Sequence, residues 1–310
     1  MGSMIGPMEE KEGYSKEFSA AANIATGPTG MMIPPSNLMI VYSVVAGSVS
    51  IAALFIGGYI PGILWGILCM VIIGILAKKR GYVSKETYTL QQGLSCFLKA
   101  IPSLLLIVIV IGGILGGIFT ATEGSAIAVV YSLILSACYH SLKLKDLPKI
   151  FLNTVKTTAI VEFMVCVSSI MSWVMSFTHI PELIANGLLG VTNNPTVILC
   201  IMNIILIFVG MFMDPTPAVL IFTPIFLPIC ESFGMSPVHF GLMIVMNLCV
   251  GTITPPVGAI LFTGCKVSDI PIEGVIKEEL PYFFAVLVAL ILVTNFPVFS
   301  MLLPQALGLC

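Results

Sequence analysis

Seven apolar runs, each close to the length needed to cross a bilayer, set the main constraint on how this chain folds. They cover residues 60–77, 101–119, 127–140, 157–178, 196–213, 238–253 and 282–303. A membrane-spanning helix needs about 20 mostly apolar residues, and in lipid every backbone N–H and C=O must be paired within the protein. Only 9% of the residues are charged, against about 25% in a soluble domain. The sequence therefore predicts an all-α polytopic membrane protein.

The reactive side chains are too scattered to indicate an enzyme. The nine cysteines form no C-x-x-C pair, and the three histidines lie far apart. A membrane-embedded enzyme would need clustered acids or histidines within its spans, and only Asp214 and Glu162 are candidates. We expect no enzymatic activity, no cofactor, no resident metal ion and no nucleic-acid partner.

An internal repeat relates the start of the chain to its last third. Residues 5–36 align without a gap on residues 226–257, at a constant separation of 221 positions. The matched pairs are Pro7 with Pro228, Gly13 with Gly234, Gly30 with Gly251, Pro34 with Pro255, and Pro35 with Pro256. A Pro–Pro pair interrupts a helix, and unpaired backbone within a membrane is tolerated only where it lines a cavity or binds a ligand. Two such breaks in matching positions are typical of secondary transporters, whereas a simple channel would not need them.

The segment 196–230 admits two topologies. Residues 196–213 either span to the cytoplasm or form, with the apolar run up to 230, a re-entrant hairpin whose tip is the turn "MDPTPA". The positive-inside rule places the basic loops 77–85 and 142–149 in the cytoplasm. If the repeat is inverted, the hairpin follows, and Asp214 at its tip faces the second helix break.

Three stretches resemble a known family. "GYSKEFSAAANIATGPTGMMIPPS", "GMFMDPTPAVLIFTPIFLPI" and "PVHFGLMIVMNLCVGTITPPVGAILF" are similar to the large membrane subunit of tripartite ATP-independent periplasmic (TRAP) transporters. The resemblance implies an elevator-type carrier in the bacterial inner membrane, driven by Na⁺, that imports organic anions such as C4-dicarboxylates or sialic acid. It also implies two partners, a small membrane subunit and a periplasmic substrate-binding protein. The alternative is a sodium/dicarboxylate symporter or antiporter that works without a binding protein.

The polar residues around the two breaks are the candidate site. For cation binding we expect Asp214, Gly251, Thr252, Thr254, Gly30 and Thr29; for substrate binding, Asn247, Thr26, Ser36 and Pro256. Several have a structural alternative: an N-cap for Asp214, hydroxyl-to-backbone bonds within the helix for Thr252 and Thr254, and an interhelical hydrogen bond for Asn247.

The expected organisation has four parts. Residues 1–58 hold the remainder of the first hairpin and its broken helix, and 59–194 the linking spans, with a capping box at Thr120 and Glu123. Residues 195–265 hold the second hairpin and broken helix, and 266–310 an interfacial arm and the last span. The partner of Asp214 in the repeat would precede Met1. We therefore expect an N-terminally truncated copy that does not transport alone.

Overall fold

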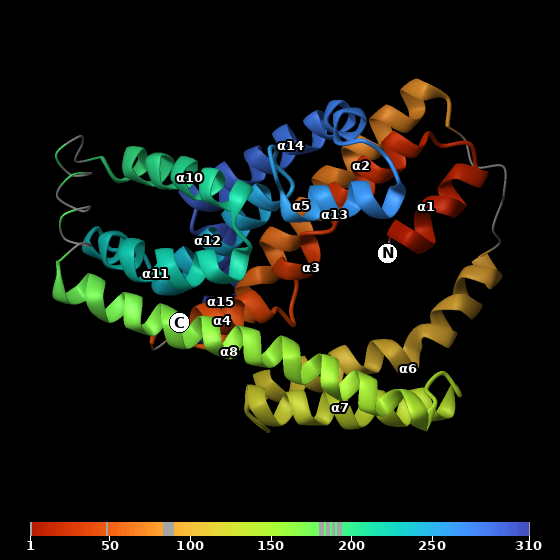
Figure 1. Ribbon diagram of the computed structural model, residues 1–310, viewed down its shortest axis with the longest axis horizontal. Coiled ribbons are helices and arrows are strands. Elements are labelled where there is room, and N and C mark those ends of the chain that lie inside the picture. Colours follow the sequence, from red (N-terminus) through yellow and green to blue (C-terminus); the bar gives the residue numbers. More distant parts are fainter. Residues whose placement is uncertain are drawn as a thin grey trace. The chain divides into compact units, whose positions relative to one another are not determined.

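The computed structural model describes residues 2–47, 49–82, 90–179, 183, 187, 190 and 194–309, and within these ranges the regular structure is entirely helical. The chain divides into two compact units (Figure 1). The first comprises residues 1–85 and 168–310, and the second comprises residues 86–167. The expectation of an all-α polytopic membrane protein is confirmed.

The first unit contains both copies of the repeat. Its helices before residue 85 are α1 (Gly2–Lys11), α2 (Lys16–Thr26), α3 (Thr29–Met32), α4 (Asn37–Ala46) and α5 (Ile51–Arg80). Those after residue 194 are α10 (Pro195–Phe212), α11 (Pro215–Ser232), α12 (Pro237–Thr252), α13 (Ala259–Ser268), α14 (Ile272–Asn295) and α15 (Val298–Ala306). The helix starts at Lys16 and Ile51 match the starts at Pro237 and Ile272, again 221 positions later. The structure thus confirms the repeat at the level of helix boundaries.

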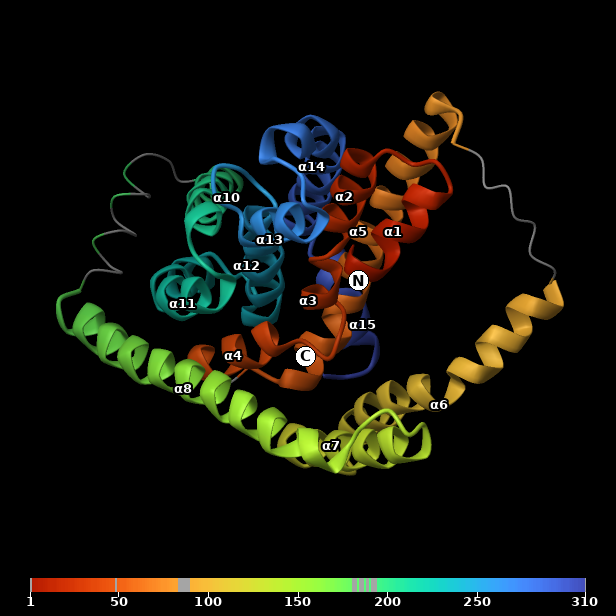
Figure 2. The ribbon, with the colours of Figure 1, turned by 45° about the vertical axis from the view of Figure 1, so that its right-hand side comes forward.

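Helices of one repeat pack against helices of the other. Helix α2 contacts α14, and the corresponding helix α12 contacts α5; likewise α4 contacts α11, and α1 contacts α13. Figures 1 and 2 show α2, α5 and α14 side by side in both views. The Tyr42 hydroxyl donates a hydrogen bond to the Pro237 carbonyl at 2.6 Å, which ties α4 to the start of α12. The two repeats therefore share one core.

The apolar helices match the expected spans only in part, because the expected runs 127–140 and 238–253 fall on shorter apolar helices, at Thr122–Cys138 and Pro237–Thr252 of the described residues. Among the described residues, four helices are long and apolar enough to cross a membrane: α5, α6 (Leu90–Leu115), α10 and α11. Two bent pairs bring the number to six: residues 16–32 with α4, at 44°, and α14 with α15, at 56°. The run 282–303, expected as one span, is bent at Pro297 because proline has no N–H to continue the helical ladder.

Helix α12 is short but is the most enclosed helix of the first unit. Every residue from Val238 to Thr252 is buried. It contacts α10, α11, α14 and α5, so protein rather than lipid surrounds it on all sides. This position brings its broken end, at Thr252, into the interior of the unit.

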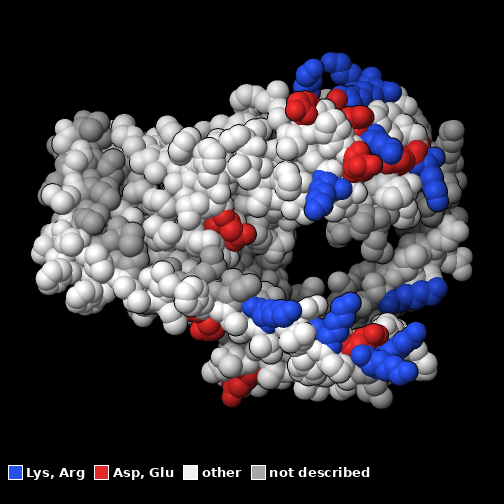
Figure 3. Space-filling view, viewed as in Figure 1, with Lys and Arg blue, Asp and Glu red and all other residues white. Residues whose placement is uncertain are grey.

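Charged side chains of the first unit gather around α1 and where α5 ends and α14 begins, while the surface over α10 has none (Figure 3). The last turn of α5 carries Lys78, Lys79 and Arg80. Arg80 forms an ion pair with Glu278 of α14 at 2.6 Å, and its guanidinium lies 5.3 Å from the ring centre of Phe18. Under the positive-inside rule, this charged end is expected at the cytoplasmic surface.

The second unit contains α6, α7 (Ala121–Cys138), a 3₁₀ turn (Leu144–Asp146) and the beginning of α8 (Leu147–Phe177). Helix α7 starts with the expected capping box. The Glu123 N–H donates to the Thr120 hydroxyl at 3.3 Å, and the Thr120 N–H donates to the Glu123 carboxylate at 2.7 Å. The Tyr131 hydroxyl donates to the Pro102 carbonyl at 2.6 Å and ties α7 to α6.

Candidate functional site

The second helix break is a tight loop between Thr252, which ends α12, and Ala259, which begins α13. The Pro255–Pro256 bond in it is cis, as is the Pro34–Pro35 bond in the first repeat. Gly258 has φ +50°, and a Cβ on it would lie 2.8 Å from the Thr254 carbonyl oxygen and 2.9 Å from that of Thr252. Two backbone oxygens therefore converge on a position that only glycine leaves open.

The threonine hydroxyls of this loop bond within the helix. The Thr252 hydroxyl donates to the Cys249 carbonyl at 2.7 Å, and the Thr254 hydroxyl donates to the Val250 carbonyl at 2.6 Å. Both side chains are buried. The hydroxyl protons are thus engaged, while the oxygen lone pairs stay available as acceptors. The Gly251 carbonyl accepts a hydrogen bond from the Thr254 N–H at 3.0 Å, so the helix break does not leave it without a partner.

The α10–α11 hairpin meets this loop at its tip. The Gly258 N–H donates to the Met211 carbonyl at 3.0 Å. A Cβ on Gly251 would lie only 2.6 Å from the Cα of Gly210, so the backbones of α12 and α10 touch there. Asp214 is the N-cap of α11, and its carboxylate accepts a hydrogen bond from the Thr216 N–H at 3.1 Å. The structure shows the capping role for an exposed Asp214.

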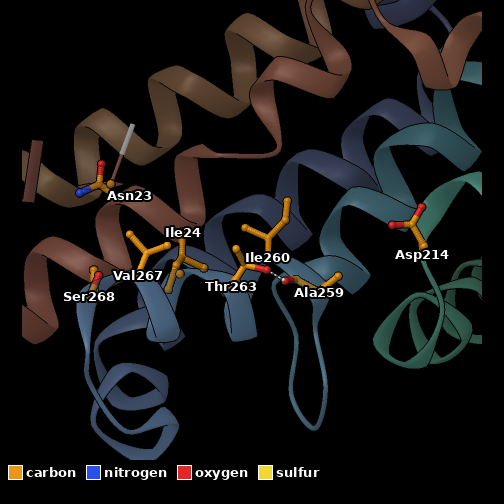
Figure 4. Close-up of a pocket in the computed structure, with 11 residues that line it drawn as sticks. Asn23, Ile24, Asp214, Ala259, Ile260, Thr263, Val267 and Ser268 are labelled. Carbon is orange, nitrogen blue, oxygen red and sulfur yellow. Dashed lines mark hydrogen bonds between the residues drawn. The ribbon is translucent and has the colours of Figure 1, made fainter. Parts of the chain in front are cut away.

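A cavity of about 460 Å³ adjoins the hairpin tip (Figure 4). Helix α2 of the first repeat and helix α13 of the second repeat supply most of its walls, with Asp214 at one end and Asn23 at the other. The side chains of Thr263 and Ser268 add polar groups, and the Thr263 hydroxyl donates to the Ala259 carbonyl at 2.7 Å. The cavity thus combines one carboxylate and a few neutral polar groups with apolar side chains, among them Ile24, Ile260 and Val267.

The first break holds its polar residues in local bonds. The Thr26 hydroxyl donates to the Ala22 carbonyl at 2.8 Å, and the Thr29 hydroxyl donates to the Thr26 carbonyl at 2.6 Å. Ser36 is the N-cap of α4, and its hydroxyl donates to the Met31 carbonyl at 2.5 Å, so the first break does not leave that carbonyl without a partner.

The two breaks approach each other inside the first unit. The Cys249 sulfur, on α12 just before the second break, lies 4.0 Å from the Pro28 carbonyl oxygen. Pro28 and Cys249 are 221 positions apart and are therefore equivalent in the repeat. Gly30, two residues later, is exposed with open space around its Cα. Equivalent positions of the two repeats thus meet beside the breaks.

Asn247 takes part in a buried interhelical hydrogen bond and is not among the residues that line the cavity. Its amide donates to the Asn203 side-chain oxygen at 2.7 Å, and the Asn203 amide donates to the Thr294 hydroxyl at 3.1 Å. The His239 ring continues this polar chain, with bonds to the Thr294 carbonyl, at 3.2 Å, and to the Ser300 hydroxyl. The interhelical bond is the structural alternative expected for Asn247, but its partners Asn203, Thr294 and His239 were not predicted; their signal is a polar residue inside each of several apolar helices.

Among the described residues, no group of three or more His, Cys, Asp or Glu side chains is placed to hold a metal ion. Any cation at the breaks would depend on backbone and hydroxyl oxygens, with Asp214 as the single nearby carboxylate of the cavity lining. Apolar helices broken around such a polar region define a polytopic membrane protein of the broken-helix transporter type.

Comparisons with known proteins identify the family. Residues 1–299 match the DctM component of the tripartite ATP-independent periplasmic transporter. The uncharacterized protein YgiK of Salmonella typhimurium is 51% identical over 304 residues, which cover 98% of this chain and 70% of YgiK. The C4-dicarboxylate TRAP transporter large permease protein DctM of Pseudomonas aeruginosa is 37% identical, over 96% of this chain and 70% of that protein. The sialic acid TRAP transporter large permease protein SiaM of Vibrio cholerae is 36% identical, over 94% of this chain and 68% of SiaM. The chain belongs to the TRAP transporter large permease (DctM) family, whose members are membrane permease subunits and not enzymes.

Proposed function

We propose that the chain is the large permease subunit of a Na⁺-driven, elevator-type TRAP transporter that imports organic anions across the bacterial inner membrane. Relatives named for C4-dicarboxylate and sialic acid transport, and a further one named for isethionate, support an organic-anion substrate. The observation that carries the Na⁺ coupling is the convergence of the Thr252 and Thr254 carbonyl oxygens on Gly258, beside the hairpin tip.

Na⁺ is a hard cation that prefers oxygen ligands, and the second break supplies them without any charged ligand. The two carbonyl oxygens and the lone pairs of the Thr252 and Thr254 hydroxyls are the donors we assign to it. The first break, with Thr29 and Gly30, is the corresponding cation site of the first repeat. The carboxylate of Asp214 adds negative potential where the cation enters.

The organic anion binds between the breaks, in the region of Thr26, Ser36 and Pro256, where bound Na⁺ offsets its negative charge. A periplasmic substrate-binding protein delivers the anion, and a small membrane subunit completes the transporter. In this proposal Asn247 does not contact the substrate. Its hydrogen bond to Asn203 holds α12 against α10 and thereby positions the helix break.

The test is Na⁺-dependent uptake by the assembled transporter, with its small subunit and a loaded binding protein, in proteoliposomes. Thr254→Val keeps the shape of the side chain and removes its oxygen, and we expect the Na⁺ concentration for half-maximal uptake to rise about tenfold, equivalent to about 1.4 kcal/mol. Thr254→Ser restores the oxygen and should behave almost as the unmodified protein.

Thr154→Val is the matched control. The Thr154 hydroxyl makes the same kind of bond, to the Ile150 carbonyl at 2.9 Å, but on an exposed helix position. Equal Na⁺ dependence of Thr254→Val and the unmodified protein would exclude Thr254 as a ligand. Uptake that persists without any binding protein would favour the binding-protein-independent symporter.

A further inference from the structure

A carboxylic acid in α14 is buried and has no hydrogen-bond partner in the described part of the chain. Glu279 is 3% exposed, and among the described residues neither of its carboxyl oxygens has a hydrogen-bond partner. Tyr282, one turn later, is 0% exposed, and its hydroxyl also lacks a partner there. Both belong to a buried stripe of α14 that is otherwise apolar around them, with Val275 before and Val286 after.

In the described structure, no basic side chain of the elements packed against α14 pairs with Glu279. On α13, the Cys265 thiol interacts with it electrostatically. On α5, Arg80 is paired with Glu278, and Cys69 interacts with Tyr282.

The lysines on those helices, Lys16, Lys78, Lys79 and Lys266, are exposed, whereas Glu279 is buried. Other titratable groups contact α14 away from Glu279. On α2, the Glu17 side chain faces Gly274, more than one turn before Glu279. On α12, His239 bonds to Thr294, near the far end of α14. Helix α15 contains no titratable residue. The other charged residues of α14, Glu273 and Lys277, lie outside its buried stripe.

An ionised carboxylate is very costly to bury without a partner, and such a group becomes neutral instead. Na⁺ would require several oxygen ligands, and among the described residues no side chain forms a hydrogen bond with the Glu279 carboxyl. A proton needs one carboxyl oxygen. We propose that Glu279 is a proton-binding site of the permease, and that its neutral, protonated form is what allows α14 to pack against α2 and α13.

Deprotonation of Glu279 places an unpaired negative charge between these helices. The packed state then binds a proton that the unfolded chain releases at neutral pH, so the folded state loses stability as the pH rises. Glu279→Gln imitates the neutral acid in size and charge, and it cannot release a proton. The variant should therefore retain the packing at every pH and lose the pH dependence.

The first measurement is the thermal unfolding midpoint of the purified, detergent-solubilised permease from about pH 6 to about pH 9. We expect the midpoint of the unmodified protein to fall over this range, and that of Glu279→Gln to fall clearly less. Glu278→Gln is the matched control, because it removes a neighbouring carboxylate that is already paired with Arg80, and it should keep the dependence of the unmodified protein. Identical pH dependence in Glu279→Gln and the unmodified protein would overturn the proposal.

The second measurement needs no variant. Dicyclohexylcarbodiimide reacts with protonated carboxyl groups in apolar surroundings, and mass spectrometry locates the adduct. We expect Glu279 to be modified at neutral pH and progressively less at higher pH, with no effect of added Na⁺ at fixed pH. Protection by Na⁺ would show a sodium site in place of a proton site and would overturn the proposal. This measurement uses the unmodified protein, so it decides the question even if Glu279→Gln does not fold. If the unmodified protein forms no adduct on Glu279 at neutral pH, the proposal is wrong. Neither readout uses transport, so the result is independent of the Na⁺-driven function proposed above.

Discussion

Glycine at positions 210 and 251 lets the backbones of α10 and α12 touch beside the second break. A Cβ on Gly251 would lie 2.6 Å from the Gly210 Cα and 2.7 Å from its carbonyl carbon. Both atoms belong to a helix backbone, which cannot move aside as a flexible side chain can. The fit of the hairpin to the broken helix therefore depends on the absence of two side chains.

Gly251→Ala should separate the two helices and destabilise the first unit. Overpacking typically costs about 1 to 3 kcal/mol, and here backbone rather than a side chain must yield. We expect a lower thermal unfolding midpoint of the purified permease and loss of Na⁺-dependent uptake.

Gly66→Ala is its control, since a Cβ on Gly66 meets no atom within 4 Å. Alanine favours a helix over glycine by about 0.5–1 kcal/mol, so this variant should unfold no earlier than the unmodified protein. An unchanged midpoint in Gly251→Ala would contradict the close approach.

The surroundings of individual side chains were the hardest feature to predict from the sequence. The sequence left Asp214 open between ligand and N-cap, and only the hydrogen bond from the Thr216 N–H shows the cap. Glu279 lies beside Lys277 and Glu278, and its stretch therefore reads as a solvated arm. The spacing of residues 275, 279, 282 and 286 places them on one buried face of a helix. This indicates burial of Glu279 only if the helix is known to continue through all four positions.

At the scale of elements, the Asn203–Asn247 bond holds α10 against α12, and Thr294 extends the bond to α14. Within apolar surroundings, an amide has few alternative partners. Interhelical polar bonds in membrane proteins nevertheless average only about 0.6 kcal/mol, because the unfolded chain also finds partners. This network therefore contributes more to the register of the helices than to overall stability.

A double-mutant cycle measures that contribution. Asn203→Leu, Asn247→Leu and the double variant should give a coupling energy of about 0.5 to 2 kcal/mol in thermal or denaturant unfolding. The control is Asn295→Leu, whose amide bonds only within its own helix, to the Ile291 carbonyl at 2.9 Å among the described bonds. Strictly additive effects of the two substitutions on the free energy of unfolding would show that the Asn203–Asn247 bond contributes no coupling energy.

Helix ends were predictable from sequence where proline and glycine mark them. The Pro–Pro pairs fall within residues 33–36 and 253–258, between the helices on either side of each break. The Thr120–Glu123 capping box at the start of α7 is likewise a local pattern. The bend at Pro297 was not predicted, because the apolar run continues through it and the pattern of hydrophobicity does not register a change of direction.

At the scale of the whole molecule, the repeat was visible in the sequence, but the exchange of helices between its copies was not. The pairings of α2 with α14 and of α12 with α5 join segments that are far apart in the chain. Composition and periodicity describe each helix singly and carry no information about which partner it meets. The predicted class and the observed architecture therefore agree, while the packing had to come from the structure.

The transport cycle also makes a prediction at this scale. If more Na⁺ charge than substrate charge moves inward, each net charge gains about 2.3 kcal/mol per 100 mV of inside-negative potential. Uptake by the assembled transporter in proteoliposomes should then increase when such a potential is imposed. The control is the same potential without Na⁺. A rate that responds to neither the potential nor a Na⁺ gradient would rule out sodium coupling.

The exchange of helices between the repeats also has a consequence for synthesis. Helix α2 ends at Thr26, and its partner α14 begins only at Ile272. At about 5–20 residues per second, translation of the intervening chain takes on the order of ten seconds or more. During that interval, the early helices wait in the membrane with their final contact surfaces uncovered. We expect the insertion machinery or membrane chaperones to shield them, and quality control to remove nascent chains that stall before α14 emerges.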